Sequence, residues 1–161
     1  MKGSITQEMF HYIPEIDFNI GYRYFLGNMD NYMAALLATL KSIKSKLPIL
    51  RSMSSSDEYQ GLRTITQTLR SISGNIGALN LAEASYELET ALLNDNTEQI
   101  NPLLSAYIVK LSELTEHLEI LLKNADVLKN ADEHTSFFNY DFSRTKESIK
   151  RSSGYLERKI I

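Results

Sequence analysis

The chain has 161 residues, with the hydrophobic fraction of 43% and charged fraction of 23% that are typical of one globular domain with a buried core. It contains no cysteine, which excludes disulfide bonds, thiolate catalysis and cysteine-based zinc sites. Residues 143–161 hold six lysines or arginines and two glutamates, whereas the first 142 residues hold eleven basic and eighteen acidic residues. Because nucleic-acid binding requires clustered positive charge, we expect none by the main body.

No apolar run approaches the ~18–20 residues needed to cross a bilayer, so no membrane span is predicted. The N-terminal sequence MKGSITQEMFHYIPEIDF lacks the continuous apolar core and the small-residue cleavage site of a secretory signal. We therefore expect a cytoplasmic protein.

The first predicted elements are short. Residues 1–17 form an amphipathic start that reaches Pro14. Asp17 is suited to cap the helix that follows, because its carboxylate can accept a hydrogen bond from a free backbone donor of the first turn. Gly27 and Asn28 then predict a break.

A longer helix is predicted from Asp30, because apolar residues recur at spacings of three and four. They are Met33, Leu36, Leu37, Leu40, Ile43, Leu47 and Leu50. Pro48 is expected to kink or interrupt this helix, since proline lacks the backbone donor and crowds the preceding turn. The serine-rich SMSSS at 52–56 is interpreted as a connection, and Ser56 or Asp57 as the cap of the next helix.

Three further helices are predicted from similar apolar stripes. The first stripe is Leu62, Ile65, Leu69, Ile72 and Ile76, which places Gln67 on the opposite side of its helix, and Gly77 should end that helix. The second is Leu79, Ala82, Ser85, Leu88 and Leu92. The third follows the polar NDNT at 94–97 and consists of Ile100, Leu104, Tyr107, Leu111, Leu114, Leu118, Leu121 and Ala125.

Long amphipathic helices with short connections predict an all-α fold, an antiparallel up-down four-helix bundle preceded by a short N-terminal helix. We expect this bundle domain to cover residues 1–128. Residues 129–161 are predicted to form a linker and a basic C-terminal helix.

Two segments resemble the histidine-containing phosphotransfer family. The central helix of that family reads approximately A-H-x-L-K-G-x-x-x-x-[ILV]-G-A, and this chain has TQTLRS at 66–71 and GNIGA at 74–78. PEID at 14–17 is similar to the P-G-I-D with which family members often begin. The resemblance covers roughly residues 12–125 and implies the four-helix bundle of a phosphorelay protein.

The sequence departs from the family at the residue that performs the chemistry, because Gln67 occupies the position of the phosphoaccepting histidine. The amide nitrogen of glutamine has its lone pair delocalised, whereas neutral imidazole is nucleophilic near pH 7. We therefore expect no catalytic residue and no enzymatic activity. Arg70 stands where the family usually has lysine, and Ser71 where it usually has glycine.

The residues around Gln67 carry two positive charges and no negative one. They are interpreted as a partner-docking face, called here the docking surface, which consists of Gln60, Arg63, Thr64, Gln67, Arg70, Ser71 and Gly74. The resemblance implies that the partner is the receiver domain of a response regulator, a histidine kinase, or both.

Other groups give no sign of chemistry. His11, His117 and His134 have no spacing typical of a metal site, and each is interpreted as a surface or structural residue. The carboxylates Glu83, Glu87 and Glu89 are interpreted as a solvated helix face. No metal and no cofactor are expected.

Two functions remain open from the sequence. The first is a phosphotransfer-like protein without an acceptor that modulates a phosphorelay by binding its partners. The alternative is a helical scaffold for structure or oligomerisation with no phosphorelay role.

Overall fold

The computed structural model describes residues 6–125, and within this range every regular element is a helix. Two short elements come first, the 3-10 helix η1 (Gln7–Tyr12) and α1 (Phe18–Tyr24). Four longer helices follow: α2 (Met29–Ser56), α3 (Leu62–Asn75), α4 (Leu79–Leu93) and α5 (Thr97–Asn124). The all-α prediction is confirmed for these residues. The predicted linker and basic helix of residues 129–161 lie outside the described residues.

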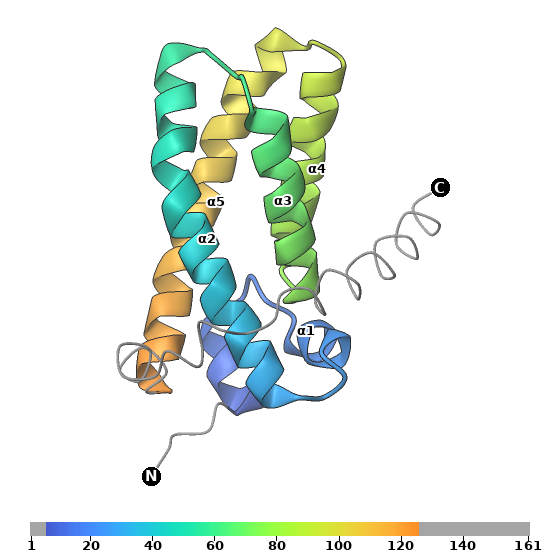
Figure 1. The fold of residues 1–161 in the computed structure, drawn as a ribbon, viewed down its shortest axis with the longest axis vertical. Coiled ribbons are helices and arrows are strands. Elements are labelled where there is room, and N and C mark those ends of the chain that lie inside the picture. The colour runs from blue at the N-terminus through green and yellow to red at the C-terminus, as the bar shows by residue number, and fades with distance from the viewer. Residues whose placement is uncertain (1–5, 126–161) are drawn as a thin grey trace.

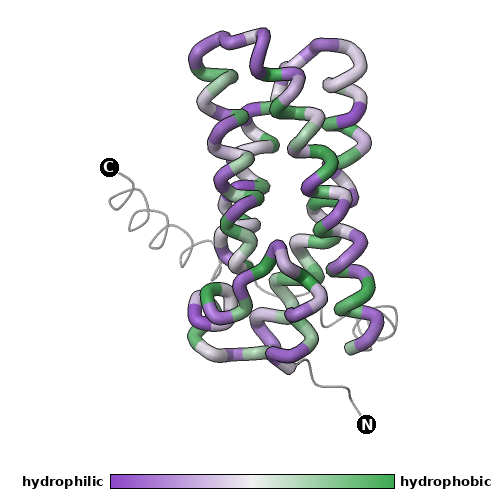
Figure 2. The backbone as a smooth tube through the Cα atoms, turned by 180° about the vertical axis from the view of Figure 1, so that it is seen from behind, coloured by the Kyte–Doolittle hydropathy of each residue, from purple (hydrophilic) through white to green (hydrophobic). Residues whose placement is uncertain are grey.

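The four longer helices lie side by side, and η1 and α1 lie across one end of them (Figure 1). Helix contacts run from α2 to α3, from α3 to α4, from α4 to α5 and from α5 back to α2. Hydrophobic and hydrophilic segments alternate along each helix (Figure 2), as expected where one side of each helix is buried. The core therefore lies among the four long helices.

The long stripe of α5 is the prediction that the structure confirms most completely. All eight of its members are buried, namely Ile100, Leu104, Tyr107, Leu111, Leu114, Leu118, Leu121 and Ala125. The cap of α1 is also confirmed, because Asp17 Oδ1 accepts a hydrogen bond of 3.3 Å from the backbone N–H of Ile20.

The prediction for the end of α2 is wrong. The helix passes through Pro48 and continues to Ser56, so the serines at 52–56 are helical. Pro48 is exposed, so water can reach the backbone carbonyl that proline leaves without a donor. Leu47 and Leu50 are buried, so their packing against the core keeps this segment helical. The serine hydroxyls also bond back within the helix, as Ser56 Oγ does to the carbonyl of Ser52 at 2.9 Å.

The predicted cap of α3 is wrong as well. The N-cap is Gly61, which has a φ of +81° and makes no side-chain cap. Asp57 instead ends α2 with a φ of 55°, and its Oδ1 accepts a hydrogen bond of 2.9 Å from Asn101 of α5. The Asp57 side chain, which could have capped α3, thus links the end of α2 to α5.

Candidate docking surface

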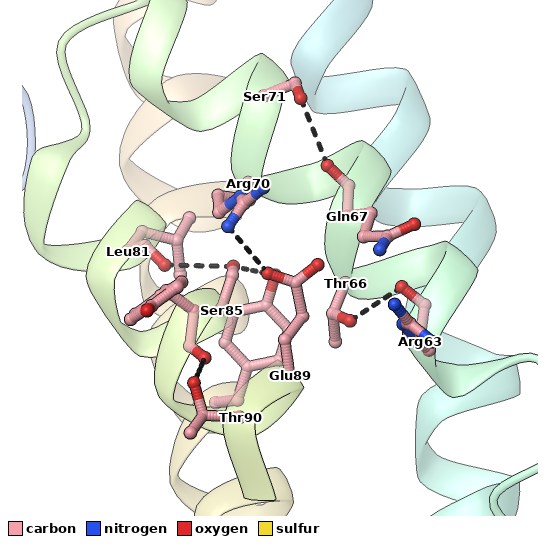
Figure 3. A network of polar contacts seen from close by, with 11 residues as sticks. Arg63, Thr66, Gln67, Arg70, Ser71, Leu81, Ser85, Glu89 and Thr90 are labelled. Atoms are coloured by element: carbon pink, nitrogen blue, oxygen red, sulfur yellow. Dashed lines mark hydrogen bonds and ion pairs between the residues drawn. The ribbon is translucent and has the colours of Figure 1, made fainter. Parts of the chain in front are cut away.

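The docking surface lies on α3 and on the turn before it, and its members differ in exposure. Gln60, Arg63, Thr64 and Gln67 are exposed, whereas Arg70, Ser71 and Gly74 are partly buried. The side chain of Gln67 therefore faces solvent, as the sequence predicted, near the middle of the helix (Figure 3).

The buried side of α3 differs from the predicted stripe by a small rotation. Its buried residues are Leu62, Thr66, Leu69, Ser73 and, at the C-cap, Ile76. Ile65 and Ile72 of the predicted stripe are only partly buried. Successive residues of a helix are about 100° apart, so a buried side centred on 66 and 73 points in a different direction from one centred on 65 and 72. In the observed orientation, Arg63 and Arg70 lie at the edge of the buried side and not opposite it. That edge faces α4.

Arg70 is held by two side chains of α4. Its Nη1 lies 2.9 Å from Glu89 Oε2 (Figure 3). Its guanidinium carbon lies 5.7 Å from the ring centroid of Tyr86. The Glu89 side chain is 6% exposed and that of Arg70 is 35% exposed. Arg70, one of the two arginines of the docking surface, is therefore paired with a buried carboxylate of the neighbouring helix.

This pair corrects the prediction that Glu83, Glu87 and Glu89 form a solvated face. Glu83 and Glu87 are exposed, but Glu89 is buried. The buried residues of α4 are Leu81, Ser85, Leu88, Glu89 and Ala91, whereas Leu79 of the predicted stripe is 47% exposed. Glu89 lies next to Leu88 on the buried side of α4. If the apolar stripe had been started at Leu81 and not at Leu79, it would have predicted that Glu89 is buried.

Burial raises the pKa of the Glu89 carboxyl, because desolvation disfavours its charged form. The positive charges of Arg70 and Arg63 and a hydrogen bond from the Gln67 side chain act in the opposite direction but do not cancel the effect of burial. The charge that the sequence assigned to the docking surface is thus partly balanced by a carboxylate from α4.

A second polar contact lies deeper between α4 and α5. Ser85 Oγ lies 2.6 Å from the hydroxyl of Tyr107 and 3.0 Å from the carbonyl oxygen of Leu81. Burial raises the pKa of Tyr107, and the nearby Glu89 charge raises it further, while the Ser85 hydrogen bond lowers it. Glu89 therefore lies between the charges of α3 and a buried phenol of α5.

The two segments that carry the family resemblance meet at one end of α3. The backbone N–H of Asp17 donates a hydrogen bond of 2.9 Å to the carbonyl of Gly77, and the Tyr32 hydroxyl donates one of 2.7 Å to the carbonyl of Ile76. Gly77 has a φ of +91°, and a Cβ there would overlap the Asp17 carbonyl. A Cβ at Gly21 would overlap the Ile76 carbonyl and the Tyr32 hydroxyl. These five residues form what we call the α1–α3 joint.

Neither histidine among residues 6–125 belongs to the docking surface. His117 Nδ1 lies 2.6 Å from Glu15 Oε1, which makes it a partnered structural residue as predicted. His11 is exposed, and His134 lies outside the described residues. Among residues 6–125 there is no group of three or more histidine, aspartate or glutamate side chains that could hold a metal ion.

None of the helices between residues 6 and 125 combines the length and the hydrophobicity that a bilayer crossing requires. Comparisons with protein-family models, with curated proteins and with solved structures found no match to this chain. The role of the docking surface is therefore inferred from its residues, their geometry and the resemblance described above.

Proposed function

We propose that this protein is a phosphotransfer-like docking protein of a phosphorelay that has lost its phosphoacceptor. It binds a receiver domain, or the kinase that serves one, and transfers no phosphoryl group. The observation that carries the proposal is the position of Gln67, a solvent-facing residue on a central helix at the place where the resembling family has its histidine. Glutamine keeps hydrogen-bonding capacity there but offers no nucleophilic nitrogen.

The proposed architecture is the up-down four-helix bundle of that family, formed by α2, α3, α4 and α5. The connections 57–61, 76–78 and 94–96 are short, which favours packing of each helix against the next. Contacts between successive long helices and between α5 and α2 agree with such a bundle. The α1–α3 joint supports the same assignment, because the PEID and GNIGA segments contact each other through Asp17 and Gly77.

The proposed partner surface is acidic. Active members of the phosphotransfer family dock the acidic pocket of receiver domains against this helix face, and Arg63 is an exposed cation of the docking surface. Gln60, Thr64 and Gln67 surround it with side chains that can donate hydrogen bonds. Complementary charge of this kind sets the rate and the specificity of association more than its final strength.

The test is calorimetric titration of the full chain with the receiver domains encoded in the same genome. We expect at least one to bind, and Arg63→Glu to abolish that binding because it places a carboxylate against an acidic pocket. Lys110→Glu is the matched control, since it makes the same charge change on an exposed position of α5. If no receiver or kinase binds, the alternative of a structural scaffold replaces this proposal.

The absence of phosphoryl transfer is tested separately. Incubation of the native chain with a phosphorylated receiver should leave it without covalently bound phosphate. Gln67→His should restore an acceptor if the surrounding surface still fits the receiver, and the phosphate should then be acid-labile and located at residue 67. Labelled phosphate on any histidine of the native chain would contradict the proposal.

A further inference from the structure

Glu89 is a buried neighbour of the docking surface that the proposed function does not use. It lies on α4, is almost completely buried, and reaches Arg70 at 2.9 Å across the contact between α3 and α4 (Figure 3). The charged and titratable groups that act on it or respond to it are Arg63 and Arg70 from α3 and Tyr107 from α5.

Arg70 has its charge balanced on the protein's own side. Glu89 pairs with its guanidinium, and the ring of Tyr86, which is 50% exposed, lies beside the same group. A partner carboxylate that takes over the Nη1 contact has to draw the guanidinium away from Glu89. Glu89 would then remain as a buried charge without its counterion, which is a costly state.

We propose that Glu89 controls how available Arg70 of the docking surface is to a partner: it holds Arg70 against α4, so that an acidic partner engages Arg63 first and competes with Glu89 for Arg70. The docking part of this inference rests on the proposed function. Glu89 is a positioning residue in this scheme, since it acts through Arg70 and need not touch the partner.

The protonation state of Glu89 then sets the availability of Arg70. Burial raises the pKa of the carboxyl, so Glu89 takes up a proton at a higher pH than an ordinary glutamate. The neutral acid attracts the guanidinium less strongly than the carboxylate does. Docking should therefore tighten as the pH falls toward that pKa, and this dependence should be absent when residue 89 cannot titrate.

The binding experiment compares the native chain with Glu89→Gln, which keeps the size of the side chain and removes its charge. With the receiver identified above, Glu89→Gln should bind about tenfold more tightly, because Arg70 becomes available for one charge-assisted contact. The double variant with Arg70→Gln should return to within about twofold of native affinity. The affinity of Glu89→Gln should also vary less with pH than that of the native chain.

The receiver affinity of the Arg70→Gln single variant is a second test, which does not require the Glu89 variant to fold. We expect this substitution to change the native affinity by less than about twofold, because the native partner does not engage Arg70. A loss of tenfold or more would show that Arg70 already contacts the partner, and it would overturn the inference while leaving the proposed function intact. Unchanged affinity of Glu89→Gln would overturn it in the same way.

The free protein provides a readout without any partner. Carbon-detected NMR of the Glu89 carboxyl should show titration above the ordinary range, and Arg70→Gln should move it higher by removing a positive charge. A Glu89 carboxyl that titrates in the ordinary range and ignores Arg70→Gln would overturn the inference. If the titration is as expected but no receiver or kinase binds, the pairing holds, and its docking role fails together with the proposed function.

Discussion

The α1–α3 joint and the docking surface both involve α3, but they differ in how well they should tolerate substitution. At the joint, two glycines leave no room for a Cβ, and Asp17 and Tyr32 satisfy the carbonyls at the end of α3. At the docking surface, a Cβ added to Gly74 would meet no atom within 4 Å, and Gln67 faces solvent.

This contrast separates two kinds of similarity to the phosphotransfer family. The residues at the joint determine how α1 sits against α3, so replacing them would damage the fold itself. The side chain at position 67 is exposed, where it donates a hydrogen bond to Glu89, and it lies outside the core, so glutamine can occupy the position without disturbing the packing. A chain can therefore keep the joint, carry a different residue at position 67 and still fold.

The largest expected effect is on the joint. Gly77→Ala should lower the free energy of unfolding by at least about 3 kcal/mol, because alanine is strained at a φ of +91° and its Cβ would overlap the Asp17 carbonyl. Urea denaturation measures the change. Gly74→Ala is the matched control inside α3, where alanine should stabilise the helix by about 0.5–1 kcal/mol. If the two substitutions changed the free energy of unfolding equally, the joint would be no more sensitive to substitution than the docking surface.

A smaller effect is expected from the hydroxyl that closes the joint. Tyr32→Phe should cost about 1–3 kcal/mol, because it leaves the buried Ile76 carbonyl without its donor. Tyr12→Phe removes the same atom from a side chain that is 81% exposed and should leave thermal and chemical unfolding unchanged. A Tyr32→Phe variant as stable as the native chain would mean that the hydrogen bond does not hold the joint.

The buried carboxyl beneath the docking surface should give a pH-dependent effect. Because burial raises the pKa of Glu89, the folded chain binds this proton more tightly than the unfolded chain. The resulting stability is present below the ordinary pKa of 4.5 and is lost as the pH rises through the raised value. Glu89→Gln should therefore gain stability relative to the native chain as the pH rises above 4.5.

Denaturant titrations at a series of pH values test this sign. Glu87→Gln makes the same chemical change on the exposed side of α4 and serves as the control. If Glu89→Gln instead loses stability relative to the native chain as the pH rises, then the ion pair with Arg70 outweighs the cost of burying the charge.

The smallest effect on stability is expected at Arg63. This side chain is exposed, so Arg63→Ala should change the free energy of unfolding by no more than about 0.5 kcal/mol. The same variant should weaken receiver binding in calorimetry, which would assign Arg63 to docking and not to folding. A large loss of stability would instead place it with the residues of the joint.

The helices could largely be predicted, because helical periodicity is a local property of the chain. The α5 stripe and the cap by Asp17 follow from spacing and side-chain chemistry alone. The prediction failed where tertiary packing outweighs a local preference, as at Pro48, which lies within α2 between two buried leucines. It failed again at Asp57, whose carboxylate accepts a hydrogen bond from α5 instead of capping α3.

The exposure of Gln67 was predictable because the residue lies opposite an apolar stripe on its own helix. The pairing of Arg70 with Glu89 was not, because the two residues are on different helices and meet only through the packing of α3 on α4. The sequence by itself thus determined the helices and the exposure of Gln67, since both depend on local order along the chain. Only the tertiary structure decided which charges of the docking surface are free, because burial and pairing depend on neighbours distant in sequence.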